Sequence, residues 1–148
     1  MSEHKFCRVE GGRLEEYVAR LGAIIAYYRG RSGSTYEKTK EVWGALQTLL
    51  RTPPRYWNEV LGVIVKRYTI DVRREDVRKC FENLLRGLLE KFTELAKNLN
   101  PHMRLELAKA IRDALDTSVS SPKPEIDSFI REFYPKKVEE GQEGGESG

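Results

Sequence analysis

Arginine and tyrosine side chains recur along one border of residues 13–31, where their types and spacing suit the binding of an anion. Arg13, Arg20, Tyr27 and Arg31 are separated by seven, seven and four residues, which keeps them on one side of a helix. Guanidinium groups bind phosphate, and a tyrosine ring can stack on a base. The spacing therefore predicts a nucleic-acid-binding strip. The same side chains would also fit the rim of a protein core, with their polar ends in water.

A second basic cluster opens a later helix. It consists of Arg73, Arg74, Arg78 and Lys79. Cations at a helix N-terminus oppose the helix dipole, so they do not serve the stability of that helix. This favours an anionic partner, although Glu75 and Asp76 lie among the cations and would neutralise part of their charge.

The chain shows none of the residue patterns on which enzymes and metal sites depend. Its two histidines, His4 and His102, lack a second ligand at metal-binding spacing, and no glycine-rich phosphate loop is present. Asp113 and Asp116 lie one helical turn apart beside cationic side chains, as expected of a solvated helix face. We therefore expect a protein that is not an enzyme and has neither a cofactor nor a metal site.

Composition favours a small basic protein of one domain. The 148 residues carry a formal net charge of +3, with 26 Lys and Arg against 23 Asp and Glu. Four of those acids lie in residues 138–148, so the remainder carries 26 minus 19, or +7. Such an excess favours anionic partners, nucleic acid first. With no leader and no apolar run of about 20 residues, we expect a soluble cytoplasmic protein without membrane contact.

The two cysteines, Cys7 and Cys80, are too few for a secreted disulfide scaffold, which favours reduced thiols in an intracellular compartment. The composition nevertheless resembles that of thermophile proteins, because charged residues make up 33% of the chain and glutamine occurs only at positions 47 and 142. Intracellular disulfides are accepted in hyperthermophiles, so a Cys7–Cys80 bond stays open.

Residues 13–31 are predicted to form the first helix, with a different surface on each side. Its apolar arc consists of Leu14, Tyr17, Val18, Leu21, Ile24, Ile25 and Tyr28. Its small side consists of Ala19, Gly22, Ala23 and Ala26. We expect the apolar arc to lie in the core and the small side to admit a neighbouring helix.

Helix start and stop signals divide the rest of the domain. Ser34 and Glu37 form a capping box for the second helix, and Thr52 with Pro53 starts the third, which runs to about Tyr68. Residues 69–72 form a linker or a brief strand at most. The third helix is expected to bury Tyr56, Trp57, Val60, Leu61 and Ile64.

The longest helical period comes next and predicts the structural spine. Its inward positions are Val77, Phe81, Leu84, Leu88, Phe92, Leu95 and Leu99. Asn100 and Pro101 end it and start a helix with Met103, Leu107, Ile111, Ala114 and Leu115 inward. After a loop at 118–124, a last helix at 125–134 turns Ile126, Phe129, Ile130 and Phe133 inward.

These elements predict an all-α fold, a compact bundle of about six helices with short loops. Residues 1–12 are expected to form a flexible arm, 13–135 the helical domain and 136–148 a disordered acidic tail.

Residues 21–46, LGAIIAYYRGRSGSTYEKTKEVWGAL, resemble the small subunits of archaeal CRISPR interference complexes. The resemblance implies a non-enzymatic subunit, stacked along a complex that bears a guide RNA, whose basic face supports nucleic acid. Some members of that family carry a small additional β part, for which this sequence has no room.

Two functions follow from the sequence. The first is a nucleic-acid-associated structural subunit that contacts phosphates of single-stranded RNA or DNA and has other protein subunits as partners. In that case, changing Arg20 or Arg31 would lower affinity without unfolding the domain. The alternative is a protein-interaction adaptor or self-associating helical bundle, of viral or mobile-element origin, with no nucleic-acid role.

Overall fold

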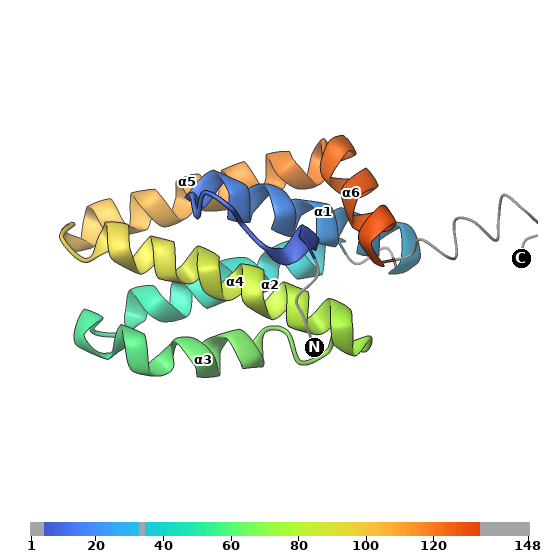
Figure 1. Ribbon diagram of the computed structural model, residues 1–148. Helices are drawn as coiled ribbons and strands as arrows, with labels where there is room; N and C mark the ends of the chain where they lie inside the picture. Colours follow the sequence, from blue (N-terminus) through green and yellow to red (C-terminus); the bar gives the residue numbers. More distant parts are fainter. Residues whose placement is uncertain (1–4, 33–34, 134–148) are drawn as a thin grey trace, which may run out of the picture.

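The computed structural model describes residues 5–32 and 35–133, which contain six α-helices and no β-strand (Figure 1). The α-helices are α1 (Leu14–Ser32), α2 (Thr35–Arg51), α3 (Trp57–Arg67), α4 (Glu75–Ala96), α5 (Pro101–Ser120) and α6 (Lys123–Phe133). Short 3-10 helices η1 (Lys5–Cys7) and η2 (Pro54–Tyr56) precede α1 and α3. The prediction of an all-α bundle of about six helices is confirmed.

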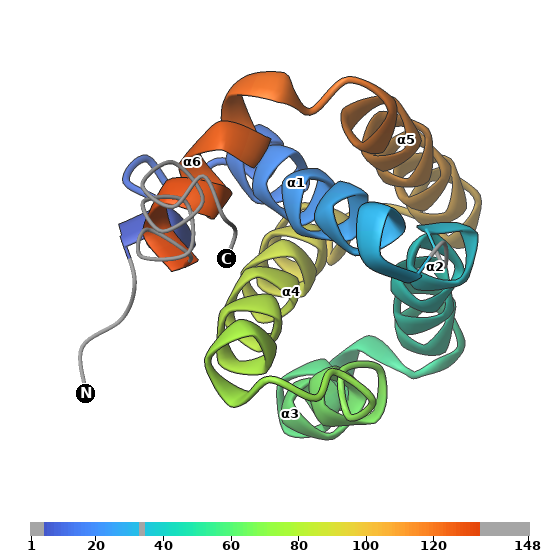
Figure 2. The same cartoon turned by 90° about the vertical axis from the view of Figure 1, so that its right-hand side faces the viewer.

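Helix α1 lies in the middle of the bundle, between α4, α5 and α6 (Figure 2). It packs most extensively against α5, and α3 lies at the edge against α4 and α2. The core between these helices is formed by Leu21, Ile24 and Ile25 of α1, Leu84, Leu88 and Phe92 of α4, and Ile111 and Leu115 of α5. Of the predicted apolar arc of the first helix, Val18, Leu21, Ile24 and Ile25 are buried in the core, and Leu14 and Tyr17 are half-buried against it.

The small side of α1 admits α5, as predicted. A Cβ atom added at Gly22 would lie 2.5 Å from Cβ of Ser118 and 2.9 Å from its carbonyl carbon. Ala23 is fully buried. The two backbones therefore approach more closely at Gly22 than any larger residue would allow.

The start of α5 confirms the predicted cap. Asn100 Oδ1 accepts a 2.8 Å hydrogen bond from the backbone N–H of Met103, and Pro101 occupies the first turn. The Asn100→Ala variant is expected to lose about 1 kcal/mol of unfolding free energy, because the amide of Met103 loses its acceptor. Urea denaturation measures this loss. The exposed Asn98→Ala, in the same connection, should leave the midpoint unchanged, and equal effects of both variants would contradict the capping role.

Some boundaries and inward positions differ from the prediction. Helix α5 continues to Ser120, so the loop expected at 118–124 is shorter. Residues 69–72 form no strand and lie in a turn. Lys38 of α2 holds this turn by contacting Asp71 at 2.5 Å. Leu95, Met103 and Ala114 are exposed rather than inward, and so is Tyr56. Tyr56 lies in η2 before α3, and no helix of the described part covers the other three side chains.

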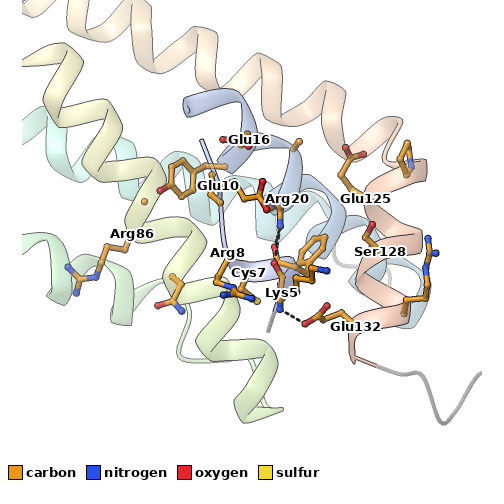
Figure 3. Close-up of a pocket in the computed structure, with 18 of the residues that line it drawn as sticks. Lys5, Cys7, Arg8, Glu10, Glu16, Arg20, Arg86, Glu125, Ser128 and Glu132 are labelled. Atoms are coloured by element: carbon orange, nitrogen blue, oxygen red, sulfur yellow. Dashed lines mark hydrogen bonds between the residues drawn. The ribbon is translucent and has the colours of Figure 1, made fainter. Parts of the chain in front are cut away.

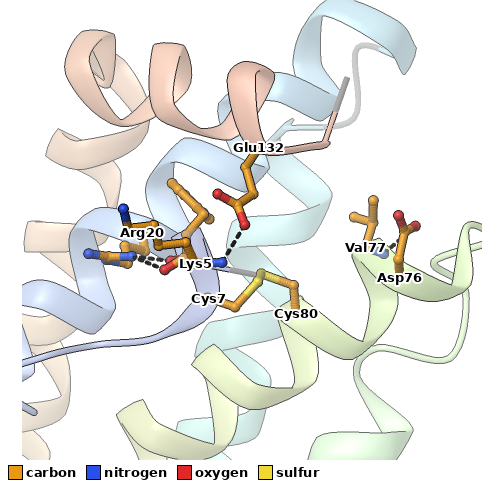
Figure 4. Close-up of a disulfide and its surroundings, with 8 residues drawn as sticks. Lys5, Cys7, Arg20, Asp76, Val77, Cys80 and Glu132 are labelled. Carbon is orange, nitrogen blue, oxygen red and sulfur yellow. Dashed lines mark hydrogen bonds between the residues drawn. A yellow bond between two sulfur atoms is a disulfide. The ribbon is translucent and has the colours of Figure 1, made fainter. Parts of the chain in front are cut away.

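The expected flexible arm at 1–12 is packed over part of its length. Phe6 and Cys7 are buried, and Cys7 forms a disulfide with Cys80 of α4 (Figure 4). The ring of Phe6 packs edge-on against Phe129 and Phe133 of α6. A single phenylalanine in a polar stretch is expected to be exposed to solvent, but α1, α4 and α6 leave space for the Phe6 ring. The Ser34–Glu37 capping box and the tail at 136–148 include residues outside the described part.

Candidate nucleic-acid interface

The border of α1 that the sequence predicts as a binding strip is largely occupied by the protein itself. Nη1 of Arg20 donates hydrogen bonds to the carbonyl oxygens of Phe6 and Lys5 (Figure 4). Its guanidinium carbon lies 5.4 Å from the centre of the Phe6 ring. Arg20 thus holds the N-terminal segment on α1, and changing it is expected to loosen that segment, contrary to the purely surface role predicted.

The other members of this strip do not form one open surface either. The ring of Tyr27 is half-buried and contacts Phe129 of α6 edge-on, with ring centres 4.8 Å apart. Arg13, which follows the N-terminal segment held by Arg20, is exposed, and the side chain of Arg31 lies outside the described part. Of the four, Arg13 is left as a described and accessible cation.

Ion pairs neutralise most of the basic cluster at the start of α4. Arg74 contacts Asp76 at 2.7 Å and donates to the carbonyl oxygen of Phe133 in α6. The ion pairs Arg78–Glu82 at 3.9 Å and Lys79–Glu75 at 3.6 Å follow at helical spacing. Arg73 is exposed, and no described acid pairs with it. The interleaved acids noted in the sequence therefore pair with three of the four cations, and only Arg73 has no ion pair with a described acid.

A cleft of 1160 Å³ lies beside the N-terminal segment, between α1, α4 and α6 (Figure 3). Its lining has five cationic residues, Lys5, Arg8, Arg20, Arg86 and Arg131, and five acidic ones, Glu10, Glu16, Glu90, Glu125 and Glu132. Glu132 accepts the backbone N–H of Lys5, and Glu90 pairs with Arg86 at 3.9 Å. With balanced charge, this cleft has no electrostatic preference for a polyanion.

A different basic surface lies where the α2–α3 and α4–α5 connections meet at one end of the bundle (Figure 1). We call it the end patch, and it consists of Arg51, Arg55, Tyr56, Lys97 and Arg104. Arg51, Arg55 and Lys97 are exposed, and no described acid pairs with them. Residues 51–58 and 95–105 together contain four Arg or Lys and no Asp or Glu, although Glu59 follows the first stretch. Of the acids that flank the second stretch, Glu94 pairs with Lys91 and Glu106 with Lys109.

Contacts of Trp57 and Arg104 hold the two connections together. The indole N–H of Trp57 donates to the carbonyl oxygens of Leu49 and Thr52, at 2.9 and 3.0 Å. The guanidinium of Arg104 lies 5.4 Å from the Trp57 ring centre. Arg104 also donates to the carbonyl oxygens of Ala96 and Lys97, at 3.0 and 3.3 Å. The geometry of the end patch is therefore set by buried and half-buried groups.

Tyr56 adds an aromatic surface to these cations. Its side chain is 41% exposed, and the guanidinium of Arg55 lies 4.8 Å from its ring centre. Cations beside an exposed aromatic ring are typical of surfaces that bind single-stranded nucleic acid.

No family model, curated protein or solved structure matches this chain. Its function must therefore be argued from its own residues.

Other chemistry is not apparent in the described residues. They contain no group of three or more His, Cys, Asp or Glu placed to hold a metal ion. His102, Asp113 and Asp116 are all exposed, and Asp113 contacts Arg112 at 3.4 Å. None of the described helices is long and apolar enough to span a membrane.

The end patch was missed because sequence reasoning followed helical periods, and these residues lie at helix ends. One signal was available: cations without acids around Thr52-Pro53-Pro54 and around Asn100-Pro101. Only the tertiary structure brings these two separate stretches together, through the contact of Arg104 with the Trp57 ring.

Proposed function

We propose that this protein is a non-enzymatic structural subunit that binds single-stranded nucleic acid at the end patch. The observation that carries the proposal is the meeting of two acid-free, cation-bearing connections beside the exposed ring of Tyr56. The resemblance of residues 21–46 to small subunits of CRISPR interference complexes favours the same role and stays a prediction.

Each side chain of the end patch has a distinct task in this proposal. Arg51, Arg55 and Lys97 contact phosphates, because their charged groups are exposed and unpaired with described acids. The ring of Tyr56 stacks on one base. Arg104 donates to backbone carbonyls, so it contributes positive potential and shape rather than a direct phosphate contact.

Recognition of this kind is independent of base sequence and depends strongly on salt. Phosphate contacts release condensed counterions, and three contacts to a single strand predict a slope of about −2 for log affinity against log salt. A duplex presents no splayed base to Tyr56, so we expect single strands to bind more tightly than duplexes of the same length.

The test compares two triple variants that remove the same charge. Arg51→Gln/Arg55→Gln/Lys97→Gln is expected to lower affinity for a single-stranded oligonucleotide by tenfold or more. Each lost phosphate contact is expected to reduce the binding free energy by about 1 kcal/mol or less. Arg8→Gln/Arg13→Gln/Arg131→Gln removes three exposed cations away from the end patch and is expected to change affinity much less. Fluorescence anisotropy at about 50 and 200 mM salt, with RNA and DNA, measures both.

Several outcomes would reject this assignment. No binding to either oligonucleotide at the lower salt concentration would reject nucleic-acid binding itself, because electrostatic attraction is strongest there. A loss confined to the Arg8, Arg13 and Arg131 variant would move the interface to the α1 side. Equal losses in both variants would indicate net charge alone. Tyr56→Ala should reduce single-strand affinity more than duplex affinity if the ring stacks on a base.

A further inference from the structure

The outer side of α3 carries apolar side chains that no described element covers. Trp57, Leu61, Ile64 and Val65 face the core. Val63 is 69% exposed on the other side, and Ile70, just after the helix, is 74% exposed. These two are the most exposed large hydrophobic side chains of the described residues.

Val63 in α3 and Ile70 in the turn directly after it are both exposed, and Lys66 and Arg67 lie between them in the sequence. Helix α3 ends at Arg67, and residues 68–71 form a turn in which the amide of Tyr68 donates to Ile64 and that of Thr69 donates to Lys66. We call the surface of Val63, Lys66, Arg67 and Ile70 the α3 ridge.

The charge on the α3 ridge is positive. Lys66 and Arg67 are exposed between the two apolar side chains, and neither has an ion pair with a described acid. Asp71, the next acid along the chain, contacts Lys38 of α2 at 2.5 Å. The ridge therefore combines aliphatic bulk with two cations, against one exposed acid, Glu59, one turn before Val63.

We propose that the α3 ridge binds an amphipathic helix of another protein, one whose apolar stripe is flanked by acidic side chains. Aliphatic side chains seven residues apart fit between the side chains of a facing helix, whereas they cannot stack on bases as an aromatic ring does. Acidic flanks on that helix complement Lys66 and Arg67. Tyr56 of the end patch directly precedes α3, whereas the α3 ridge begins in the second half of that helix. The inference therefore does not rest on the nucleic-acid proposal.

A second copy of the chain is a poorer occupant of the same surface. In a twofold dimer the ridge would face itself, which would bring Lys66 and Arg67 against the same cations of the partner. Like charges across an interface disfavour that pairing.

The probe is a synthetic helical peptide of about 20 residues with leucine on one stripe and glutamate on both sides of it. The full chain is expected to bind this peptide in fluorescence anisotropy. Val63→Ser/Ile70→Ser should weaken binding by about tenfold or more. Lys66→Gln/Arg67→Gln should weaken it and reduce its salt dependence.

The matched control, Leu95→Ser/Met103→Ser, also removes two exposed apolar side chains, at the other end of the bundle, and should leave peptide affinity unchanged. Circular dichroism melts verify that all variants fold. The proposal is overturned if the full chain does not bind the peptide, or if the control weakens binding as much as the ridge variant does. It is also overturned if light scattering shows a dimer that Val63→Ser/Ile70→Ser dissociates.

An oligonucleotide titration separates this proposal from the proposed function. If Val63→Ser/Ile70→Ser lowers oligonucleotide affinity while peptide binding is unaffected, the ridge belongs to the nucleic-acid interface and the docking proposal is wrong. If oligonucleotides do not bind while the ridge variant loses the peptide, the nucleic-acid function fails and the docking surface stands.

Discussion

Replacing Cys7 and Cys80 with alanine is expected to lower the free energy of unfolding by about 4 kcal/mol relative to the oxidised protein. The disulfide joins residues 73 positions apart, and a closed loop of that length restricts the unfolded chain strongly. The Cα atoms lie 5.4 Å apart, a separation that a disulfide spans readily. Because domains of this size are stable by about 5–15 kcal/mol, the loss would be a large fraction of the total.

Urea denaturation of the wild type with and without dithiothreitol, alongside the double variant, measures this contribution. Reductant should lower the wild-type midpoint towards that of the double variant, which should itself be insensitive to reductant. Mass spectrometry of the intact chain under non-reducing conditions shows whether the bond is present. An oxidised wild type with the same midpoint as its reduced form would contradict the prediction.

The loss of the disulfide should be felt first in the N-terminal segment. Phe6 still packs on Phe129, and Arg20 still binds the carbonyl of Phe6, so part of the attachment survives. Hydrogen exchange of residues 5–12 is expected to accelerate more than exchange in α4 and α5.

The Gly87→Ala variant is expected to lower the free energy of unfolding by about 2 kcal/mol, although alanine is the better helix former. A Cβ atom at Gly87 in α4 would lie 2.1 Å from Cε1 and 2.5 Å from Cζ of Tyr17 in α1. Either the ring leaves its place and loses its packing, or α1 and α4 move apart. Overpacking of this kind costs about 1–3 kcal/mol, more than the gain in helix propensity.

Gly62→Ala in α3 is the matched control. Its added Cβ would meet only the end of the flexible Arg86 side chain, at 3.1 Å, so we expect a gain of up to about 1 kcal/mol. Combining Gly87→Ala with Tyr17→Leu should recover part of the lost stability, because the ring that blocks the methyl group is gone. Thermal and urea denaturation of the four proteins measures both effects. A Gly87→Ala variant as stable as Gly62→Ala would contradict the close packing of α1 on α4.

Helices and their order could be predicted from the sequence because their signals are local. The period from Val77 to Phe92 requires one apolar side of a helix, and the cap at Asn100 needs only the amide three residues away. Gly22 likewise indicated a close helix contact, and the structure identifies α5 as the neighbour.

Inward positions at helix ends could not be predicted with the same success. Leu95 and Met103 were expected inward from the helical period, yet both are exposed because no described element covers their side chains. Phe6 is the opposite case, since it lies outside any amphipathic period and is buried by α6. Burial depends on whether a neighbour is present, and a helical period records only the side on which it would have to lie.

Tertiary structure also decided which cations are accessible to solvent. Sequence alone determined that the chain is helical and basic, because composition and spacing are properties of the chain itself. It could not determine that Arg20 binds the carbonyl of Phe6, or that Arg51 and Lys97 lie at the same end of the bundle. Whether a charge meets solvent, an acid or a carbonyl depends on groups distant in sequence, which only the packing of the helices brings together.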